Sequence, residues 1–251
     1  MRKITLEGAI NARSLEGMKS AYGTIRPNKL IRTGHLHGLS DSDVELLKQE
    51  GLQVVIDLRT PGEHDEKPDR QMEGVENIHL PIFDNAVMGI THEREQDPLI
   101  RMSKAPDLGV VYHKIVGPEA IEMWKQIFDV FDKYRNGTIS WHCSAGKDRC
   151  GMTAYMIEYI LGVDEQTRIN DYLQSNEDFE PRAEKLRQQA LERGLSEEAA
   201  LNIKRMLMVD EDYLRSAISF INENYGSIDG FLLKCGVDEQ YKERLREAFL
   251  E

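Results

Sequence analysis

One stretch decides the fold of this chain: TISWHCSAGKDRCG, residues 138–151. Residues 138–143 are mostly apolar or β-branched, which predicts a buried strand. Residues 144–151 are polar and contain two glycines, which predicts a turn. The turn leads into the apolar segment 152–161, which predicts a buried helix that Gly162 ends. A strand, a short loop and a helix in direct succession indicate an α/β fold.

The segments on either side extend this pattern. Residues 40–51 predict a helix with Ser40 at its N-cap and Gly51 at its end, and residues 52–59 predict a buried strand. Further expected elements are a short strand at 78–81, a helix at 119–134 and acidic helices beyond residue 164. Residues 84–118 show little periodicity, which favours an irregular insertion or a lid.

The composition is that of an ordinary globular protein, with 251 residues, 40% of them hydrophobic and 30% charged. Neither a repeat nor a Pro/Gly/Ser-rich linker divides the chain, so we expect a single domain over residues 1–251. The sequence has no apolar run long enough to cross a membrane, and residues 1–7 lack the apolar core of a secretory signal. We therefore expect no stable membrane insertion.

The net charge of −12 argues against a general affinity for nucleic acid or anionic membranes, because the long-range field repels both. The three cysteines, Cys143, Cys150 and Cys235, are too few and of the wrong parity for a disulfide framework. The odd number of cysteines points to a reducing compartment. We expect a cytoplasmic protein, with export by a route that lacks a cleaved signal left open.

The chemistry is expected in the loop after the strand. A loop that enters a helix N-terminus points several backbone N–H groups into one concavity, where the helix dipole adds positive charge. Arg149 follows Cys143 with a C-x5-R spacing, which places a thiol beneath a bound phosphorus and a guanidinium beside its oxygens. The same positive charge would lower the pKa of Cys143 and make it a nucleophile. The expected phosphate-binding residues are Ser144, Ala145, Gly146, Lys147, Asp148 and Arg149.

Residues 142–151, HCSAGKDRCG, resemble the HCxAGKDRTG signature of the atypical bacterial protein tyrosine phosphatases, the tyrosine/serine phosphatase family. The resemblance extends over nearly the whole chain. Further segments similar to family positions are residues 11–17, 30–36, 55–59, 171–176 and 225–228.

This resemblance implies a fold related to the dual-specificity phosphatases: a mostly parallel twisted sheet flanked by helices, with extra helices covering the active site. It also implies hydrolysis of phosphotyrosine through a phosphocysteine on Cys143, without a cofactor or a metal. Some family members accept phosphoserine, phosphothreonine or phosphoinositides. The expected partner is thus a phosphorylated protein or a small phosphomonoester; the physiological substrate and the oligomeric state are not predicted.

Three carboxyl groups are candidates for the general acid that protonates the leaving group. Asp148 comes first, because it lies in the loop and the family places an acid there. Asp57 comes second, at the carboxyl end of a predicted strand, where α/β sites form. Asp84 is third, and spacing alone does not decide between them.

Other polar residues near these segments have two interpretations each. Lys147 either contacts substrate or is a solvated cation that closes the turn, and His142 is expected to hold the loop by hydrogen bonding. Arg32 and Arg59 are candidates for substrate contacts or structural ion pairs. The pair of histidines at 35 and 37 is expected to be structural, since the spacing of a closed zinc site is missing.

Cys150 departs from the family signature, which has Thr or Ser at this position. A thiol is a weaker hydrogen-bond donor than a hydroxyl, so we expect a somewhat higher pKa at Cys143 and slower breakdown of the phosphoenzyme. Alternatively, Cys150 forms a disulfide with oxidised Cys143 and protects it from further oxidation.

Two other functions compete with hydrolysis. A catalytically silent phosphate-binding module would use the same loop, although intact Cys143, Asp148 and Arg149 argue against it. A thiol redox enzyme would normally carry a C-x-x-C motif, which this sequence lacks.

Overall fold

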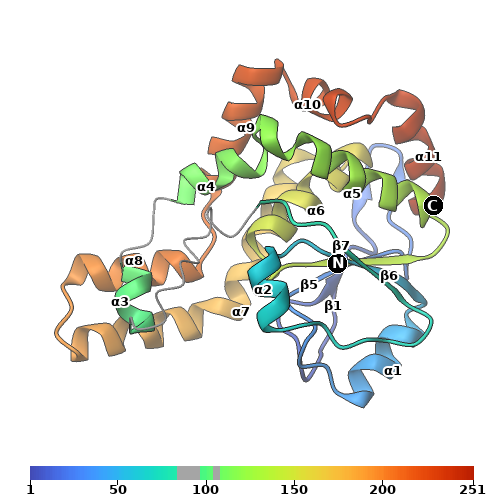
Figure 1. Cartoon of the computed structure of the whole chain (residues 1–251). Helices are drawn as coiled ribbons and strands as arrows, with labels where there is room; N and C mark the ends of the chain where they lie inside the picture. The colour runs from blue at the N-terminus through green and yellow to red at the C-terminus, as the bar shows by residue number, and fades with distance from the viewer. Residues whose placement is uncertain (84–96, 104–107) are drawn as a thin grey trace.

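A computed structural model describes residues 1–83, 97–103 and 108–251 (Figure 1). Its strands are β1 (Arg2–Lys3), β2 (Arg13–Ser14), β3 (Lys19–Ser20), β4 (Gly23–Thr24), β5 (Leu30–Thr33), β6 (Leu52–Asp57), β7 (Glu76–His79) and β8 (Thr138–His142). Its helices are α1 (Asp41–Gln49), α2 (Pro61–Glu66), α3 (Pro98–Ser103), α4 (Leu108–Ile115), the 3-10 helix η1 (Pro118–Ala120), α5 (Ile121–Lys133), α6 (Asp148–Ile160), α7 (Glu165–Glu192), α8 (Glu197–Leu207), α9 (Glu211–Tyr225), α10 (Ile228–Lys234) and α11 (Glu239–Phe249).

The main sheet has the strand order β1-β2-β5-β8-β6-β7, with β8 between β5 and β6. The strands β5, β8, β6 and β7 are parallel, and β1 and β2 complete one edge in antiparallel orientation. The register aligns four strand ends in one row: Thr33, His142, Asp57 and His79. The chain therefore leaves four adjacent strands at the same edge of the sheet, where ligand sites of parallel sheets form.

Each face of the sheet packs against its own core, because successive strand residues point to opposite faces. Val54 and Ile56 belong to the larger core, which includes residues of α5 and α6. Val55 belongs to the smaller core, with Leu47 of α1 and residues of the N-terminal segment. In Figure 1, α5 and α6 accordingly lie on one side of the sheet and α1 on the other. This layering confirms the predicted mostly parallel sheet flanked by helices.

A third, smaller apolar cluster lies among α3, α7 and α8, away from the sheet. Its buried members are Leu99, Ala190, Ala200 and Ile203. Figure 1 shows α7 and α8 extending beyond the edge of the sheet, with α3 beside them. Throughout the three described ranges, no helix is both long enough and apolar enough to span a membrane.

Two parts of the chain differ from the sequence prediction. The helix after the loop begins at Asp148 rather than near residue 152, so the loop is shorter and Arg149 lies in the first helical turn. Residues 108–115 form a regular helix, α4, with Val111, Tyr112 and Ile115 buried, so the expectation of an irregular insertion is wrong there. Residues 84–96 and 104–107, including the candidate acid Asp84, lie outside the described residues.

Candidate active site

The loop between β8 and α6 turns sharply at Gly146, which has a φ of +69°. A Cβ atom at this position would lie 2.5 Å from the carbonyl oxygen of Thr33, so only glycine fits. The loop ends at Lys147, the N-cap of α6, and no side chain caps this helix. The backbone N–H of Cys150 in the first turn of α6 donates to Cys143, and a bound anion would be a suitable partner for the N–H groups at this helix end.

Two side chains hold the loop from behind through its carbonyl oxygens. Arg32 donates from Nη2 to the oxygens of Gly146 (3.0 Å) and Lys147 (3.3 Å). Asn11 donates from Nδ2 to the oxygens of Ala145 (3.3 Å) and Gly146 (2.9 Å). In a trans peptide the C=O and the following N–H point in opposite directions. These contacts therefore turn the N–H groups that follow toward the opposite, open side of the loop.

Asp171 on α7 holds the arginines behind the loop. Its Oδ2 lies 2.5 Å from Nη1 of Arg32, and its Oδ1 lies 2.8 Å from Nε of Arg13. All three side chains are buried, and the two guanidinium groups hold the pKa of Asp171 below its usual value. Arg32 is thus a structural ion pair, one of the two interpretations that the sequence allowed.

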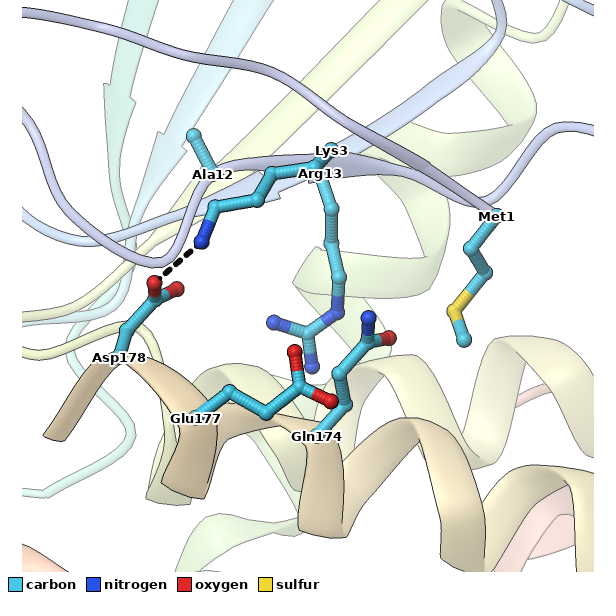
Figure 2. A pocket seen from close by; sticks show the side chains of 7 residues that line it. All are labelled: Met1, Lys3, Ala12, Arg13, Gln174, Glu177 and Asp178. Carbon is cyan, nitrogen blue, oxygen red and sulfur yellow. Dashed lines mark hydrogen bonds and ion pairs between the residues drawn. The ribbon is translucent and has the colours of Figure 1, made fainter. Parts of the chain in front are cut away.

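Arg13 also lines a small cavity (Figure 2). The other lining residues are Met1, Lys3, Ala12, Gln174, Glu177 and Asp178, and Nζ of Lys3 lies 2.5 Å from Oδ1 of Asp178. None of the residues 143–149 lines this cavity, so it is distinct from the loop.

Cys143 lies at the start of the loop and is only 2% exposed. A hydrogen bond from the Cys150 thiol is the largest cause that lowers its pKa, to about 5. Burial opposes this shift, and the positive charge of Arg149 adds to it. At neutral pH Cys143 is therefore a thiolate, the form that acts as a nucleophile.

Arg149 is fixed by a carboxylate that the sequence analysis did not single out. Its Nη1 and Nη2 donate to Oε2 (2.6 Å) and Oε1 (2.9 Å) of Glu63 on α2. Ser144 also donates to Oε1 of Glu63, at 2.5 Å. Glu63 thus binds the end of the guanidinium that the two Nη atoms form. The edge formed by Nε and Nη2 still has N–H groups that can donate to a phosphoryl group.

Glu63 is placed by the local sequence around it. Thr60 caps α2 and Pro61 opens it, while Glu63 at the third helical position accepts from the Thr60 N–H at 2.9 Å. This is a capping box, and its sequence signal was the Thr60-x-x-Glu63 spacing. The hydrogen bond and charge of Arg149 lower the pKa of Glu63 to about 2 despite its burial. The capping box thus places an ionised carboxylate beside Arg149.

Asp148 lies in the first turn of α6 with 24% of its side chain exposed. Tyr112 of α4 donates to its Oδ1 at 2.8 Å, and the hydroxyl of Tyr172 lies 2.6 Å from that of Tyr112. The loop, α4 and α7 together therefore fix the orientation of this carboxyl group at the edge of the site.

The comparisons with known proteins identify the family of this chain. A model of the tyrosine phosphatase family matches residues 4–251. The chain belongs to this family. It is accordingly a hydrolase of the protein-tyrosine phosphatase class and not a silent phosphate-binding module.

The sequences of three relatives align with most of this phosphatase. Triple specificity protein phosphatase PtpB of Mycobacterium tuberculosis is 26% identical, with 98% of each chain covered. A tyrosine-protein phosphatase of Nostoc commune is 26% identical over 88% of this chain and 74% of its own. A Cupriavidus necator protein is 29% identical over 88% of this chain and 80% of its own. The crystal structure of P. aeruginosa TpbA aligns with 88% of this chain and 98% of its own at 16% identity and a TM-score of 0.33, too low to support any argument.

Asp57, the second candidate acid of the phosphatase, lies in a buried ion-pair network at the end of β6. It is 3% exposed, and Arg59 donates to both of its carboxylate oxygens, at 2.9 and 2.7 Å. His64 lies 2.9 Å from Oδ2, and these partners hold the pKa of Asp57 well below its usual range. Asp69 completes the network, 3.0 Å from Arg59 and 2.7 Å from His142.

Two groups in the described residues bring potential metal ligands within 4.8 Å of one another: Asp57, His64 and His79, and Asp57, Asp69 and His142. Both groups include Asp57, whose oxygens already accept hydrogen bonds from Arg59. The guanidinium supplies the positive charge that a metal would bring, so we interpret both groups as parts of the ion-pair network.

The remaining polar candidates of the phosphatase have structural partners. Lys147 is buried, and its Nζ donates to the carbonyl oxygens of Met206 (2.7 Å) and Met208 (3.2 Å) at the end of α8. Lys147 is therefore not a solvated cation, and it ties the loop to the segment that follows α8. The rings of His35 and His37 pack against each other, with centroids 4.1 Å apart.

The low pKa of Cys143 predicts its reactivity toward iodoacetamide. The alkylation rate of Cys143 should rise with a midpoint near pH 5, because its pKa is lowered to about 5. Peptide mass spectrometry over a pH series measures this rate. Cys235 is the internal comparison, since burial raises its pKa to about 12. A Cys143 midpoint near the ordinary thiol value of about 8.5 would contradict the assignment.

Replacing Glu63 tests whether it positions Arg149. Glu63→Gln keeps a side chain that serves in a capping box but removes the charge paired with Arg149. We expect kcat/KM for p-nitrophenyl phosphate to fall about tenfold, since the guanidinium loses its fixed orientation. Glu66→Gln, at an exposed position on the same helix, is the control. An unchanged kcat/KM in the Glu63→Gln enzyme would show that Arg149 needs no such partner.

Proposed function

We propose that this phosphatase hydrolyses phosphotyrosine through a phosphocysteine on Cys143. One observation carries the proposal: a buried cysteine with a pKa of about 5 begins the loop that leads to Arg149, whose guanidinium Glu63 fixes at one end only. Such a loop binds a tetrahedral dianion with its amides and with the open side of Arg149. The phosphorus then lies over the thiolate, which is the geometry for in-line attack.

The proposed reaction has two steps. The Cys143 thiolate attacks phosphorus, the bond to the tyrosyl oxygen breaks, and Asp148 gives that oxygen its proton. A water molecule then attacks the phosphocysteine, Asp148 takes a proton from it, and inorganic phosphate and the thiolate are released. Arg149 and the amides of residues 144–148 would stabilise the negative charge on the equatorial oxygens in both transition states.

The choice of Asp148 over Asp57 follows from their surroundings. A general acid must reach the leaving group and must be able to take up a proton. Asp148 is partly exposed and accepts a hydrogen bond from the neutral Tyr112, while the Lys147 ammonium lies farther away, 3.5 Å from its Oδ2. Asp57 is buried and paired with Arg59, which keeps it ionised. We therefore assign Asp57 a structural role, holding Arg59 and the end of β6.

An aromatic side chain supports an aryl phosphate as the preferred substrate. Phe83 is half-buried, and the guanidinium carbon of Arg149 lies 5.4 Å from the centre of its ring. A phenyl group attached to a bound phosphate would find this ring close by, whereas a serine side chain presents no aromatic surface. The name of the M. tuberculosis relative describes three specificities. We propose phosphoserine, phosphothreonine and phosphoinositides only as secondary substrates.

Replacement of the nucleophile tests the mechanism directly. Cys143→Ser should lower kcat for p-nitrophenyl phosphate by at least about a thousandfold, because a serine hydroxyl is not ionised at neutral pH. Cys235→Ser is the matched control, since Cys235 is buried after α10, away from the loop. Hydrolysis by the Cys143→Ser enzyme at the parental rate would refute the phosphocysteine.

The leaving group distinguishes the two candidate acids. Asp148→Asn should lower kcat about a hundredfold for phenyl phosphate and much less for p-nitrophenyl phosphate, whose leaving group needs little protonation. Asp57→Asn should affect both substrates alike, because it disturbs the ion pair with Arg59. Initial rates of the two variants with both esters provide the comparison. Equal losses for both esters in the Asp148→Asn enzyme would assign the acid elsewhere.

A further inference from the structure

Two buried tyrosines reach Asp148 from outside the loop that carries it. Tyr112 belongs to α4 and Tyr172 to α7, and both side chains are fully buried. The hydroxyl of Tyr112 donates to Oδ1 of Asp148 at 2.8 Å, and the hydroxyl of Tyr172 lies 2.6 Å from that of Tyr112. The three groups therefore form a hydrogen-bond chain that ends on the carboxyl group proposed as the general acid.

The direction of this chain follows from the number of protons in it. A phenolic hydroxyl has one proton, and Tyr112 gives its proton to Asp148, so Tyr172 must be the donor in the 2.6 Å contact. Because Oδ1 of Asp148 accepts from Tyr112, a proton that this acid transfers would reside on Oδ2. The Lys147 ammonium lies 3.5 Å from Oδ2 but donates to two backbone carbonyl oxygens at shorter distances.

The packing of three helices holds the two hydroxyls in place. The Tyr172 ring lies against Gly151 of α6, where an added Cβ would be only 2.8 Å from Cδ2 of the ring. Glycine destabilises a helix interior relative to alanine, but here it lets the ring approach the helix. The Tyr172 and Tyr112 rings meet edge to face with centroids 6.3 Å apart, and the Tyr213 ring of α9 lies 5.8 Å from that of Tyr112. Neither tyrosine hydroxyl can therefore move far from Asp148.

We propose that Tyr112, oriented by Tyr172, is a positioning residue for Asp148: it holds one carboxyl oxygen so that the other presents its proton to the leaving group. The Asp148 side chain is 24% exposed, so without this contact it would be free to adopt other rotamers in solvent. A general acid must lie within hydrogen-bond reach of the oxygen that it protonates, and a small displacement slows the reaction. The inference rests on the proposed function, in which Asp148 protonates the leaving group.

Coupled substitutions test the proposal on the full chain. Tyr112→Phe removes the hydroxyl and keeps the ring. We expect kcat/KM to fall about tenfold for phenyl phosphate and less than about twofold for p-nitrophenyl phosphate, whose leaving group needs little protonation. Added to Asp148→Asn, the same change should cause no further loss with either ester, because the amide has no acidic proton to position. Tyr172→Phe should lower kcat/KM for phenyl phosphate about threefold, since Tyr112 keeps its contact with Asp148 but loses its own donor.

Tyr241→Phe is the matched control. The Tyr241 hydroxyl is also buried and donates to the carbonyl oxygen of Phe128 at 2.6 Å, between α11 and α5, neither of which carries a residue of the site. This variant loses one buried hydrogen bond and should keep the wild-type rates with both esters.

The outcomes separate a positioning role from a structural one. Unchanged rates in the Tyr112→Phe enzyme, equal losses with both esters, or a further loss in the Asp148→Asn background would each overturn the proposal. If Asp148→Asn alone still affects phenyl phosphate selectively, the proposed function stands without this inference. Equal losses with both esters in Asp148→Asn would overturn the proposed acid and the inference together.

Discussion

A buried guanidinium holds the active-site loop from behind, and the rest of the site depends on it. Arg32 lies between Asp171 and the carbonyl oxygens of residues 146 and 147. Removing one partner of a buried ion pair costs about 3–5 kcal/mol, a large part of the stability of about 5–15 kcal/mol that domains have. Because Arg32 comes from β5 and Asp171 from α7, segments far apart in the sequence must both be folded before the loop has its shape.

The same pairing of a fixed arginine with a carboxylate recurs at the site. Asp171 holds Arg32, Asp57 holds Arg59, and Glu63 holds Arg149. Of these three arginines, Arg149 is the one for which we propose contact with a bound anion. The net charge of −12 therefore says little about the site. Local pairing and the dipole of α6 determine the potential there, and overall charge governs only long-range encounters.

The sequence predicted the parts of this arrangement that depend on local pattern. The apolar run before Cys143, Gly146 and the C-x5-R spacing were sufficient to place Cys143 in a loop at a strand end with Arg149 shortly after it. The pattern could not choose between Asp148 and Asp57, because burial and ion pairing are tertiary properties. Glu63 was missed for a related reason: its Thr60-x-x-Glu63 spacing predicts a helix start, but only the packing of α2 brings it to Arg149. The hydrogen bond from Tyr112 to Asp148 was not predicted, because α4 follows a segment whose sequence shows little periodicity.

Cys150 is both a buried residue of α6 and an influence on the pKa of Cys143. Cys150 lies in the first turn of α6, and its side chain is the largest cause that lowers the pKa of Cys143. Burial alone would raise the pKa of Cys143, and a hydrogen bond from residue 150 counteracts it. Serine or threonine would do so with a stronger hydrogen bond. A cysteine gives up some of that strength, so the low pKa of Cys143 also depends on the positive charge of Arg149 and on the backbone N–H of Cys150.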